Sequence, residues 1–424
     1  MNRVKSIWLL LSSDAVLCCN EQQQTSSTGI NLMSLELFTK IAKLAIEQSW
    51  ECTILADSNA IPEAYQVLCD KIDAHIVIPS NYNGIVSGEC TTVVFESNRM
   101  EFIAKYPLVS RAILRVQRSH LPQLSKMTLV LLNHFPHISI KHPELLQYND
   151  EDMIIYKDQL LEISQWLLDK EESWSDYRVS CLTDRFWIND ANECSAGIKS
   201  LAIGPTGGLY LCTATAHDGR SPCGHILGKL EIPNRHLLTR GYSVPCGKCD
   251  ASHCSRCAFL NKQSTLEFCV PSKNVCQIAH FEMEVQAWFA QQAMKKGLWN
   301  ESFSAPESPT IYDPYELVKV EEAPPIGNLW HRLVTFDGHP ENLRPPMMLD
   351  IIHNIQGCFQ ALVTCTKAGH APSVELMKSD ILASLRRQTI EQYRDAMFQK
   401  DCPTVHEIEL LMCNAVREIL NSTE

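Results

Sequence analysis

Residues 51–80 read ECTILADSNAIPEAYQVLCDKIDAHIVIPS, and this stretch indicates the kind of sheet that the chain forms. ECTILAD and HIVIPS are short apolar runs typical of buried strands, and IPEAYQVLCDKI between them has the pattern of a helix with a proline near its start. Parallel strands need a crossover connection, which is usually a helix. A strand, a helix and a strand in succession therefore predict a parallel pair.

The same alternation extends to both sides of this stretch. It predicts further strands at 5–11, 91–97 and 111–116, and further helices at 35–46, 119–132 and 151–170. We therefore expect residues 1–178 to form an α/β domain with a parallel, partial-barrel-like sheet. Neither GxGxxG nor GxxxxGK[ST] occurs in the sequence, so it offers no support for a nucleotide-phosphate site.

Charge and hydropathy limit the partners that we expect. The 424 residues carry a formal net charge of −12, which argues against a sequence-independent nucleic-acid binder, because such a protein needs a basic face. The apolar run near the start, Ile7 to Leu11, is shorter than a signal peptide or a membrane span requires. We expect a cytoplasmic protein without a membrane partner.

Residues 179–282 differ in character, because glycines, turns and cysteines replace the long periodic segments. Nine of the 19 cysteines lie between Cys194 and Cys276. Residues 198–212, IKSLAIGPTGGLYLC, predict a hairpin whose strands meet at Pro205–Gly208. In a reducing compartment clustered cysteines indicate a metal or redox site rather than disulfides.

The spacing of these cysteines suits soft metals. Residues 246–257, CGKCDASHCSRC, contain two pairs of cysteines, each pair with two residues between its members, and Cys194, Cys212 and Cys276 lie on either side. Thiolates so spaced can bind tetrahedral zinc or the corners of an iron–sulfur cube. Only four residues separate the pairs, and seven spaced thiolates exceed what one zinc needs, so two metal centres fit better. Zinc remains the alternative.

At this point the residues resemble a known family. Cys194-x12-Gly207-x4-Cys212, followed by CGKCDASHCSRC and Cys276, resembles the SPASM domain of radical SAM peptide-modifying enzymes. Residues 182–212 and 246–261 are similar to the CXXX-repeat peptide maturases, which are associated with ribosomally made cysteine-repeat peptides. The resemblance covers about residues 181–282.

The resemblance implies two auxiliary [4Fe–4S] clusters. One would be ligated by Cys246, Cys249, Cys254 and Cys276, and the other would take three ligands from Cys194, Cys212 and Cys257. The candidates for its fourth ligand are a non-protein group, Cys223, Cys269, His217 and, slightly favoured, Cys181. The spacing CX2CX4CX2C departs from the commoner CX2CX5CX3C of SPASM domains. This departure weakens the resemblance more for the three-cysteine site than for the four-cysteine site.

The CxxxCxxC motif that binds the SAM-cleaving cluster does not occur before residue 181. The family resemblance therefore implies an iron–sulfur protein that takes part in maturing a cysteine-rich precursor peptide without its own SAM-cleaving cluster. It would bind the peptide, transfer electrons or do both, with a partner maturation enzyme as a further candidate partner, and whether it is itself an enzyme stays open. The alternative from another class is a non-catalytic zinc-bound scaffold or interaction module.

Other residues have simpler interpretations. His134, His137 and His142 form a weak zinc candidate on an expected loop, and His253 and His280 are expected to be structural. Residues 283–424 predict a helical region with a proline-rich connector, in which Val285, Trp288 and Phe289 are expected in the core. We expect the scattered cysteines to be buried core thiols: Cys18, Cys19, Cys52, Cys69, Cys90, Cys181, Cys358, Cys365, Cys402 and Cys413.

Overall fold

The computed structural model describes residues 4–22, 32–86, 88, 90–187, 194–219, 221–230, 232, 235–240, 246, 249–251, 254–265, 271–299 and 307–310. The strands in this part of the chain are β1 (Ser6–Leu10), β2 (Glu51–Leu55), β3 (His75–Pro79), β4 (Thr91–Glu96), β5 (Arg111–Arg115), β6 (His137–Lys141), β7 (Arg178–Val179), β8 (Ser200–Ile203), β9 (Gly208–Tyr210) and β10 (Gly224–His225).

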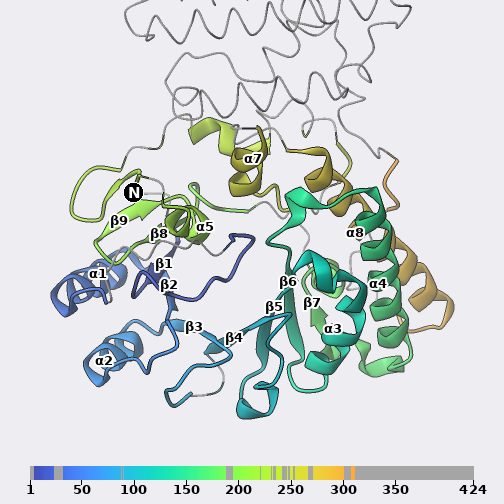
Figure 1. Ribbon diagram of the computed structural model, residues 1–424, viewed down its shortest axis with the longest axis horizontal. Coiled ribbons are helices and arrows are strands. Elements are labelled where there is room, and N and C mark those ends of the chain that lie inside the picture. Colours follow the sequence, from blue (N-terminus) through green and yellow to red (C-terminus); the bar gives the residue numbers. More distant parts are fainter. Residues whose placement is uncertain are drawn as a thin grey trace, which may run out of the picture. The chain divides into compact units, whose positions relative to one another are not determined.

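These strands form a single ten-stranded sheet in the order β10-β9-β8-β1-β2-β3-β4-β5-β6-β7 (Figure 1). Every neighbouring pair from β8 to β7 is parallel, whereas β9 runs antiparallel to both β8 and β10. The predicted α/β class with a mostly parallel sheet is confirmed. The sheet includes strands from both sides of residue 178, because β8 pairs directly with β1.

The helices predicted within the first 178 residues fall close to their predicted positions. The described helices are α1 (Leu35–Gln48), α2 (Glu63–Lys71), α3 (Leu124–Leu132), α4 (Asp150–Leu168), α5 (Thr213–His217), α7 (Ala258–Thr265) and α8 (Lys273–Lys295). Of these, α5 and α7 were not predicted. The 3₁₀ segments are η1 (Ile103–Lys105), η2 (Arg118–Gln123), η3 (Leu145–Gln147), η4 (Glu171–Asp176), η5 (Thr183–Trp187) and η6 (Arg235–Leu238). No helix among the described residues is both long enough and apolar enough to cross a membrane.

Two expectations about elements are wrong. Residues 137–141, HISIK, were expected in a loop but form β6, in parallel register with β5. Their alternation of polar side chains with Ile138 and Ile140 is the two-residue period of a strand. The helix expected from about residue 283 begins at Lys273, so His280 lies inside α8 rather than at its start.

Alternate residues of the central strands pack into two hydrophobic clusters. One face of the sheet, with Ile7 of β1 and Phe95 of β4, packs against residues of α1 and α4. The opposite face, with Leu10 of β1 and Val94 of β4, packs against Val16 and other residues of the segment after β1. That segment therefore covers this face of the sheet together with Ala216 of α5.

Residues of α8 belong to the same hydrophobic cluster as residues of the first 178 positions. Val285 and Phe289 are each 1% exposed, and the partly buried Trp288 packs against the core, as predicted. The ring centroids of Trp174 and Phe289 lie 5.1 Å apart, with the two rings edge to face. Aromatic pairs in this arrangement stabilise a core beyond the area that they bury.

The chain divides into two compact units. One consists of Met1–Leu238, Asp250–Leu260 and Lys273–Tyr312, and the other of Thr239–Cys249, Asn261–Ser272 and Asp313–Glu424. The three helices predicted within residues 347–420 and the proline-rich connector lie outside the described residues, apart from a few positions of the connector.

Candidate metal centre

Cys212 lies directly after the hairpin, at the start of a short helix. The strands β8 and β9 pair antiparallel, as predicted. The turn between them requires Gly207, because its φ is +88° and an added Cβ would lie 2.7 Å from His225 Nε2. Cys212 is the N-cap of α5, where its amide donates to Thr215 Oγ1 at 3.1 Å. The hairpin therefore delivers this thiol to the end of β9.

Two backbone hydrogen bonds bring Cys194 beside the second cysteine pair and the hairpin. The amide of Cys194 donates to Ser255 O at 2.7 Å, two residues before Cys257. The amide of Gly197 donates to Leu211 O at 3.1 Å, next to the cysteine that ends the hairpin. Segments far apart in the sequence thus meet where the three-cysteine site was predicted.

The thiols of these three residues influence one another electrostatically. Burial is the main cause that raises the pKa of Cys212 well above its usual value, and the charges of Cys194 and Cys257 raise it further. Burial and the charge of Cys194 likewise raise the pKa of Cys257 to about 12. Like charges that face one another in a water-poor site need a cation to ionise together. A bound metal supplies such a cation.

The spacing of the sulfurs bears on the kind of metal that fits. Tetrahedral zinc, with Zn–S bonds of about 2.3 Å, holds its sulfurs about 3.8 Å apart. Within the described part of the chain, no three of the thiols at this site have sulfurs that all lie within 4.8 Å of one another. In a four-iron cube each thiolate binds a different iron, so the sulfurs are more widely spaced. The sulfur donors at this site could hold a metal, and the kind of metal belongs to the proposed function.

The first cysteine pair of the predicted four-cysteine site is a tight turn. The amide of Cys249 donates to Cys246 O at 3.3 Å. Arg240 holds this turn with two donors: its Nε donates to Cys246 O at 3.0 Å, and its Nη2 donates to Cys249 O. The guanidinium fork fixes two carbonyls of one turn, which suits a pair of thiols that must point the same way.

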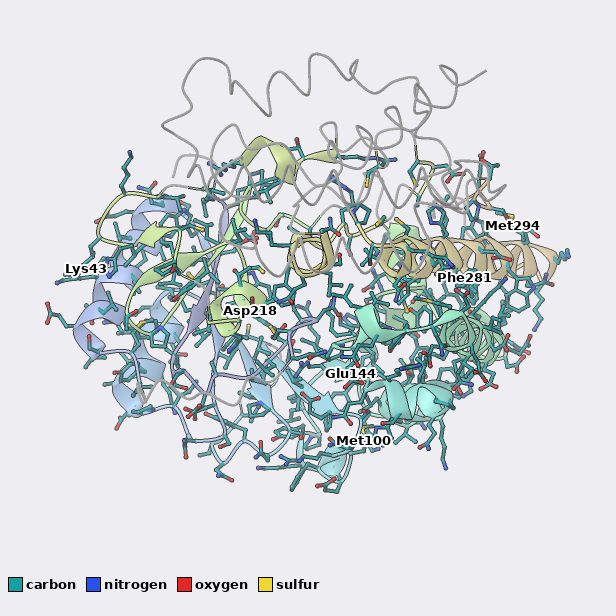
Figure 2. The ribbon with its side chains drawn as sticks, turned by 45° about the horizontal axis from the view of Figure 1, so that its top comes forward. Lys43, Met100, Glu144, Asp218, Phe281 and Met294 are labelled. Atoms are coloured by element: carbon teal, nitrogen blue, oxygen red, sulfur yellow. The ribbon has the colours of Figure 1, made fainter. Side chains whose placement is uncertain are left out.

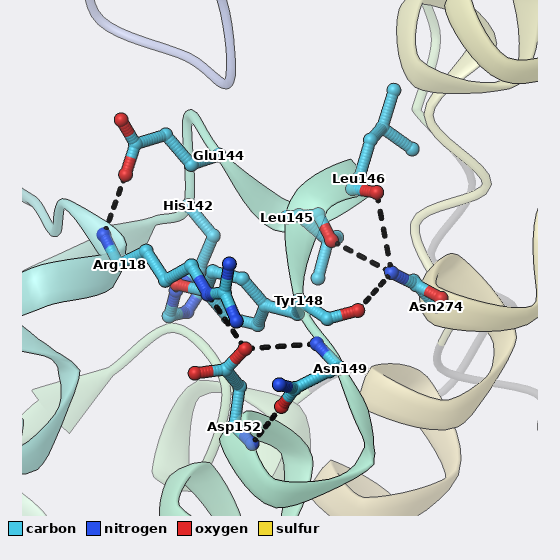
Figure 3. Close-up of polar contacts among 9 residues, drawn as sticks. All are labelled: Arg118, His142, Glu144, Leu145, Leu146, Tyr148, Asn149, Asp152 and Asn274. Atoms are coloured by element: carbon cyan, nitrogen blue, oxygen red, sulfur yellow. Dashed lines mark hydrogen bonds and ion pairs between the residues drawn. The ribbon is translucent and has the colours of Figure 1, made fainter.

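Cys276 of the same predicted set lies in α8, in the other unit, together with Cys254. Figure 3 shows how the start of α8 is anchored: Asn274 Nδ2 donates to the carbonyls of Leu145, Leu146 and Tyr148, at 3.1, 3.4 and 2.7 Å. Cys276, two residues further on, is buried. The chain after β6 therefore determines where this thiol lies.

His280 lies one helical turn beyond Cys276 and is 2% exposed. Its Nδ1 donates to Cys276 O at 2.7 Å, and its Nε2 lies 3.8 Å from a carboxylate oxygen of Asp250. The other carboxylate oxygen of Asp250 accepts from Thr310 N at 2.5 Å. These contacts support the structural role that was predicted for His280. His253 and Cys269 lie outside the described residues.

The histidine group does not form a zinc site. His137 begins β6 and His142 follows its last residue. Five residues of strand span about 16 Å, which is too far for two ligands of one ion. His142 is instead buried, with its Nδ1 3.0 Å from Tyr148 Oη. Burial lowers the pKa of His142 to about 3.

The scattered cysteines divide into two kinds. Cys52, Cys69 and Cys181 are buried, as predicted, and burial raises the pKa of Cys52 to about 11. Cys90 is exposed, contrary to the prediction, and Cys358, Cys365, Cys402 and Cys413 lie outside the described residues.

Sequence reasoning placed Cys18 and Cys19 among the core thiols, which is confirmed for Cys18 but not for Cys19. Cys18 is 1% exposed and belongs to the core of the sheet's open face. Cys19 is only half-buried, and its charge raises the pKa of each thiol of the three-cysteine site. No spacing pattern relates residues 18 and 19 to the other cysteines, so only the folded chain could identify them.

No protein-family model matches the chain, and no curated protein matches it either. Among solved structures, the chain has a weak similarity to Streptococcus suis SuiB, which was crystallised bound to the precursor peptide SuiA. The TM-score is 0.34 and 11% of the residues are identical; the match covers 52% of this chain and 62% of SuiB. The chain thus spans less than two thirds of that protein, and a likeness at this level carries no argument about function.

Proposed function

We propose that this chain is an iron–sulfur protein that takes part in the maturation of a ribosomally synthesised cysteine-repeat peptide. The observation that supports the proposal is that backbone hydrogen bonds join the segments of Cys194, Cys212 and Cys257, three thiols that the family resemblance assigns to one cluster. The amide of Cys194 donates to Ser255 O at 2.7 Å, and the amide of Gly197 donates to Leu211 O at 3.1 Å. Cysteine thiolates are the ligands that an iron–sulfur cluster takes.

The chain's own residues would hold two clusters. Cys194, Cys212 and Cys257 would hold one, and Cys246, Cys249, Cys254 and Cys276 would hold the other. A bound [4Fe–4S] cluster supplies one-electron transfer. The proposed organisation is an α/β domain over 1–178, partial-barrel-like in its sheet, a SPASM-like domain over 179–282, and a helical region with its proline-rich connector over 283–424.

The absence of CxxxCxxC from the first 180 residues supports a role without SAM cleavage. The proposed partners are a cysteine-rich precursor peptide and a separate maturation enzyme that would use the electrons. We propose that the protein acts in the cytoplasm. Binding of the peptide and passage of electrons through the clusters are both compatible with this role.

Metal analysis of anaerobically purified protein tests the proposal. We expect a brown protein with iron and acid-labile sulfide at about four to eight of each per chain, for one or two cubes. A colourless protein with stoichiometric zinc and no sulfide would overturn the proposal and favour the zinc-bound scaffold. A cysteine-repeat peptide that does not bind the iron-loaded protein would remove the proposed partner.

A further inference from the structure

The guanidinium of Arg185 is buried without a partner for two of its donors. Arg185 lies in η5 and is 7% exposed. Neither its Nε nor its Nη1 has a hydrogen-bond partner among the residues that the structure describes. Burying a guanidinium is costly unless its charge is paired and its donors are satisfied. Since the proposed function gives Arg185 no role, this cost needs another explanation.

Two hydrogen bonds show where Arg185 lies relative to α8. Gln286 Nε2 of α8 donates to Cys181 O at 2.7 Å, so the chain that follows β7 is held against this helix. The amide of Arg185 donates to Leu182 O at 3.2 Å, which closes a turn that begins directly after Cys181. Arg185 therefore follows closely on a residue whose backbone is fixed by α8.

A carboxylate of α8 lies in the same region. Tyr156 Oη of α4 donates to Glu282 Oε1 at 2.8 Å, and the Cys181 thiol forms a hydrogen bond with the same tyrosine. Figure 2 shows α8, on which Phe281 is labelled, beside α4. Within the described part of the chain, no ion pair joins Arg185 to Glu282, although the charge of Arg185 acts on this carboxylate. Glu282 is thus near Arg185 without satisfying its donors.

Two cations act on this single carboxylate. Burial raises the pKa of Glu282, whereas the charges of Arg185 and of Lys141, the last residue of β6, lower it. Burial also raises the pKa of Tyr156, so its hydroxyl stays uncharged near neutral pH. The cluster of Arg185, Lys141, Glu282 and Tyr156 therefore carries a net positive charge, and protonation of Glu282 would increase it. A bound anion would balance this charge.

The other carboxylate close to Arg185 in the sequence is already paired. Asp184 Oδ1 lies 3.8 Å from Arg178 Nη1, and the Arg178 guanidinium also lies over the ring of Trp187. Burial raises the pKa of Asp184, and of the charges that lower it Arg178 has the largest effect and Arg185 a smaller one. The Asp184 carboxylate therefore belongs mainly to Arg178, and Arg185 remains the cation without a partner.

We propose that Arg185 binds a small oxyanion, either a phosphate or a carboxylate group, through its Nε and Nη1 donors. A planar guanidinium is suited to hydrogen-bond the oxygens of both groups. Lys141 would add favourable charge, and the partly exposed Arg185 side chain is not sealed from solvent. This inference goes beyond the proposed function and does not depend on it, because none of the residues of the cluster is a proposed metal ligand.

Calorimetric titration of the anaerobically purified protein with sodium phosphate, and separately with sodium acetate, tests the proposal. Sodium chloride at equal ionic strength is the control for general salt effects. We expect saturable binding of phosphate or acetate that chloride does not reproduce. Tighter binding of phosphate would identify a phosphate group as the ligand, and tighter binding of acetate would identify a carboxylate. No saturable binding of either anion would overturn the proposal.

Replacing Arg185 by methionine removes the donors while keeping much of the side-chain length. Loss of charge-assisted hydrogen bonds should weaken anion binding by about tenfold or more. The control is Arg111→Met, which removes an exposed arginine and should leave the affinity within about twofold of the unaltered protein. Equal affinity in Arg185→Met and Arg111→Met would overturn the proposal.

Stability without added anion separates ligand binding from a structural role. An unpaired buried charge can be replaced by an apolar side chain without loss of stability, so Arg185→Met should unfold at the same urea concentration as the unaltered protein or at a higher one. If Arg185 only braces the fold, the variant should unfold at a lower urea concentration. That result, with no anion effect in the unaltered protein, would overturn the proposal.

A second variant keeps the proposal testable if Arg185→Met does not fold. Glu282→Gln keeps an acceptor for Tyr156 but removes the negative charge of the cluster. Anion binding should therefore strengthen, by roughly threefold or more, because the repulsion from the carboxylate is lost. A structural role of Arg185 predicts no such gain. Unchanged or weaker anion binding in Glu282→Gln would overturn the proposal.

Discussion

Replacing Arg115 by methionine tests how the segment after β1 is held. The Arg115 side chain is 3% exposed, pairs with Glu96, and donates to the carbonyls of Cys19 and Glu21. Methionine keeps much of the side-chain length but removes every donor. In the variant, the carbonyls of Cys19 and Glu21 and the carboxylate of Glu96 therefore lose the hydrogen bonds that Arg115 donates.

The size of the effect follows from the burial of these partners. A hydrogen bond to a charged group contributes about 1.5–3 kcal/mol, and breaking a fully buried ion pair costs about 3–5 kcal/mol. Glu96 is 34% exposed, so water hydrates it in part and lowers this cost. We expect Arg115→Met to reduce the free energy of unfolding by about 2–4 kcal/mol. Arg115→Lys keeps the charge without the fork, so it should lose roughly half as much.

Urea unfolding of the reduced, metal-free protein, followed by tryptophan fluorescence and circular dichroism, measures the change. The control is Arg111→Met, because Arg111 is exposed at the start of the same strand and should change stability by less than about 0.5 kcal/mol. In Arg115→Met the Cys19 thiol should also react faster with iodoacetamide. If Arg115→Met and Arg111→Met unfold at the same urea concentration, the guanidinium does not hold the segment as we argue.

Three further predictions concern other parts of the chain. Burial lowers the pKa of His142 to about 3, against about 6.5 in the unfolded chain. The contribution of neutral His142 to the free energy of unfolding should therefore be complete above about pH 6.5. Below that pH the free energy of unfolding should fall by about 1.4 kcal/mol per pH unit as the pH drops toward 3. In urea titrations at several pH values, His142→Gln should flatten this pH dependence, whereas His134→Gln, at an exposed position, should not. Equal pH dependence in the two variants would contradict a buried, neutral His142. In the same assay Phe289→Ala should reduce the free energy of unfolding by about 3–5 kcal/mol, because its side chain is 1% exposed. Met294 of the same helix is 48% exposed, so Met294→Ala should reduce it little. Reduced protein incubated with S-adenosylmethionine should form no 5′-deoxyadenosine above background by chromatography, and steady formation would show an unrecognised SAM-cleaving site.

Local pattern was enough to predict most of the sheet. The strands β1 to β5 and the helices α1, α2 and α4 lie within a few residues of the predicted ranges, because their apolar periods are regular. The strand β6 was missed although Ile138 and Ile140 alternate with polar residues, because the histidines around it drew a loop interpretation. The start of α8 at Lys273 was missed because its first turns carry Cys276, which was read as part of the cysteine-rich region.

The cysteine spacing alone also indicated a soft-metal site, and the family resemblance grouped Cys194, Cys212 and Cys257. The position of Cys19 beside them is different in kind. It depends on the pairing of β1 with β8 and on the crossing of residues 11–22 to Arg115 and His142. Such contacts join residues about a hundred or more positions apart, and no short-range period records them. The amino-acid pattern therefore indicated which residue types would bind a soft metal, while only the register of the sheet decided which distant segments lie side by side.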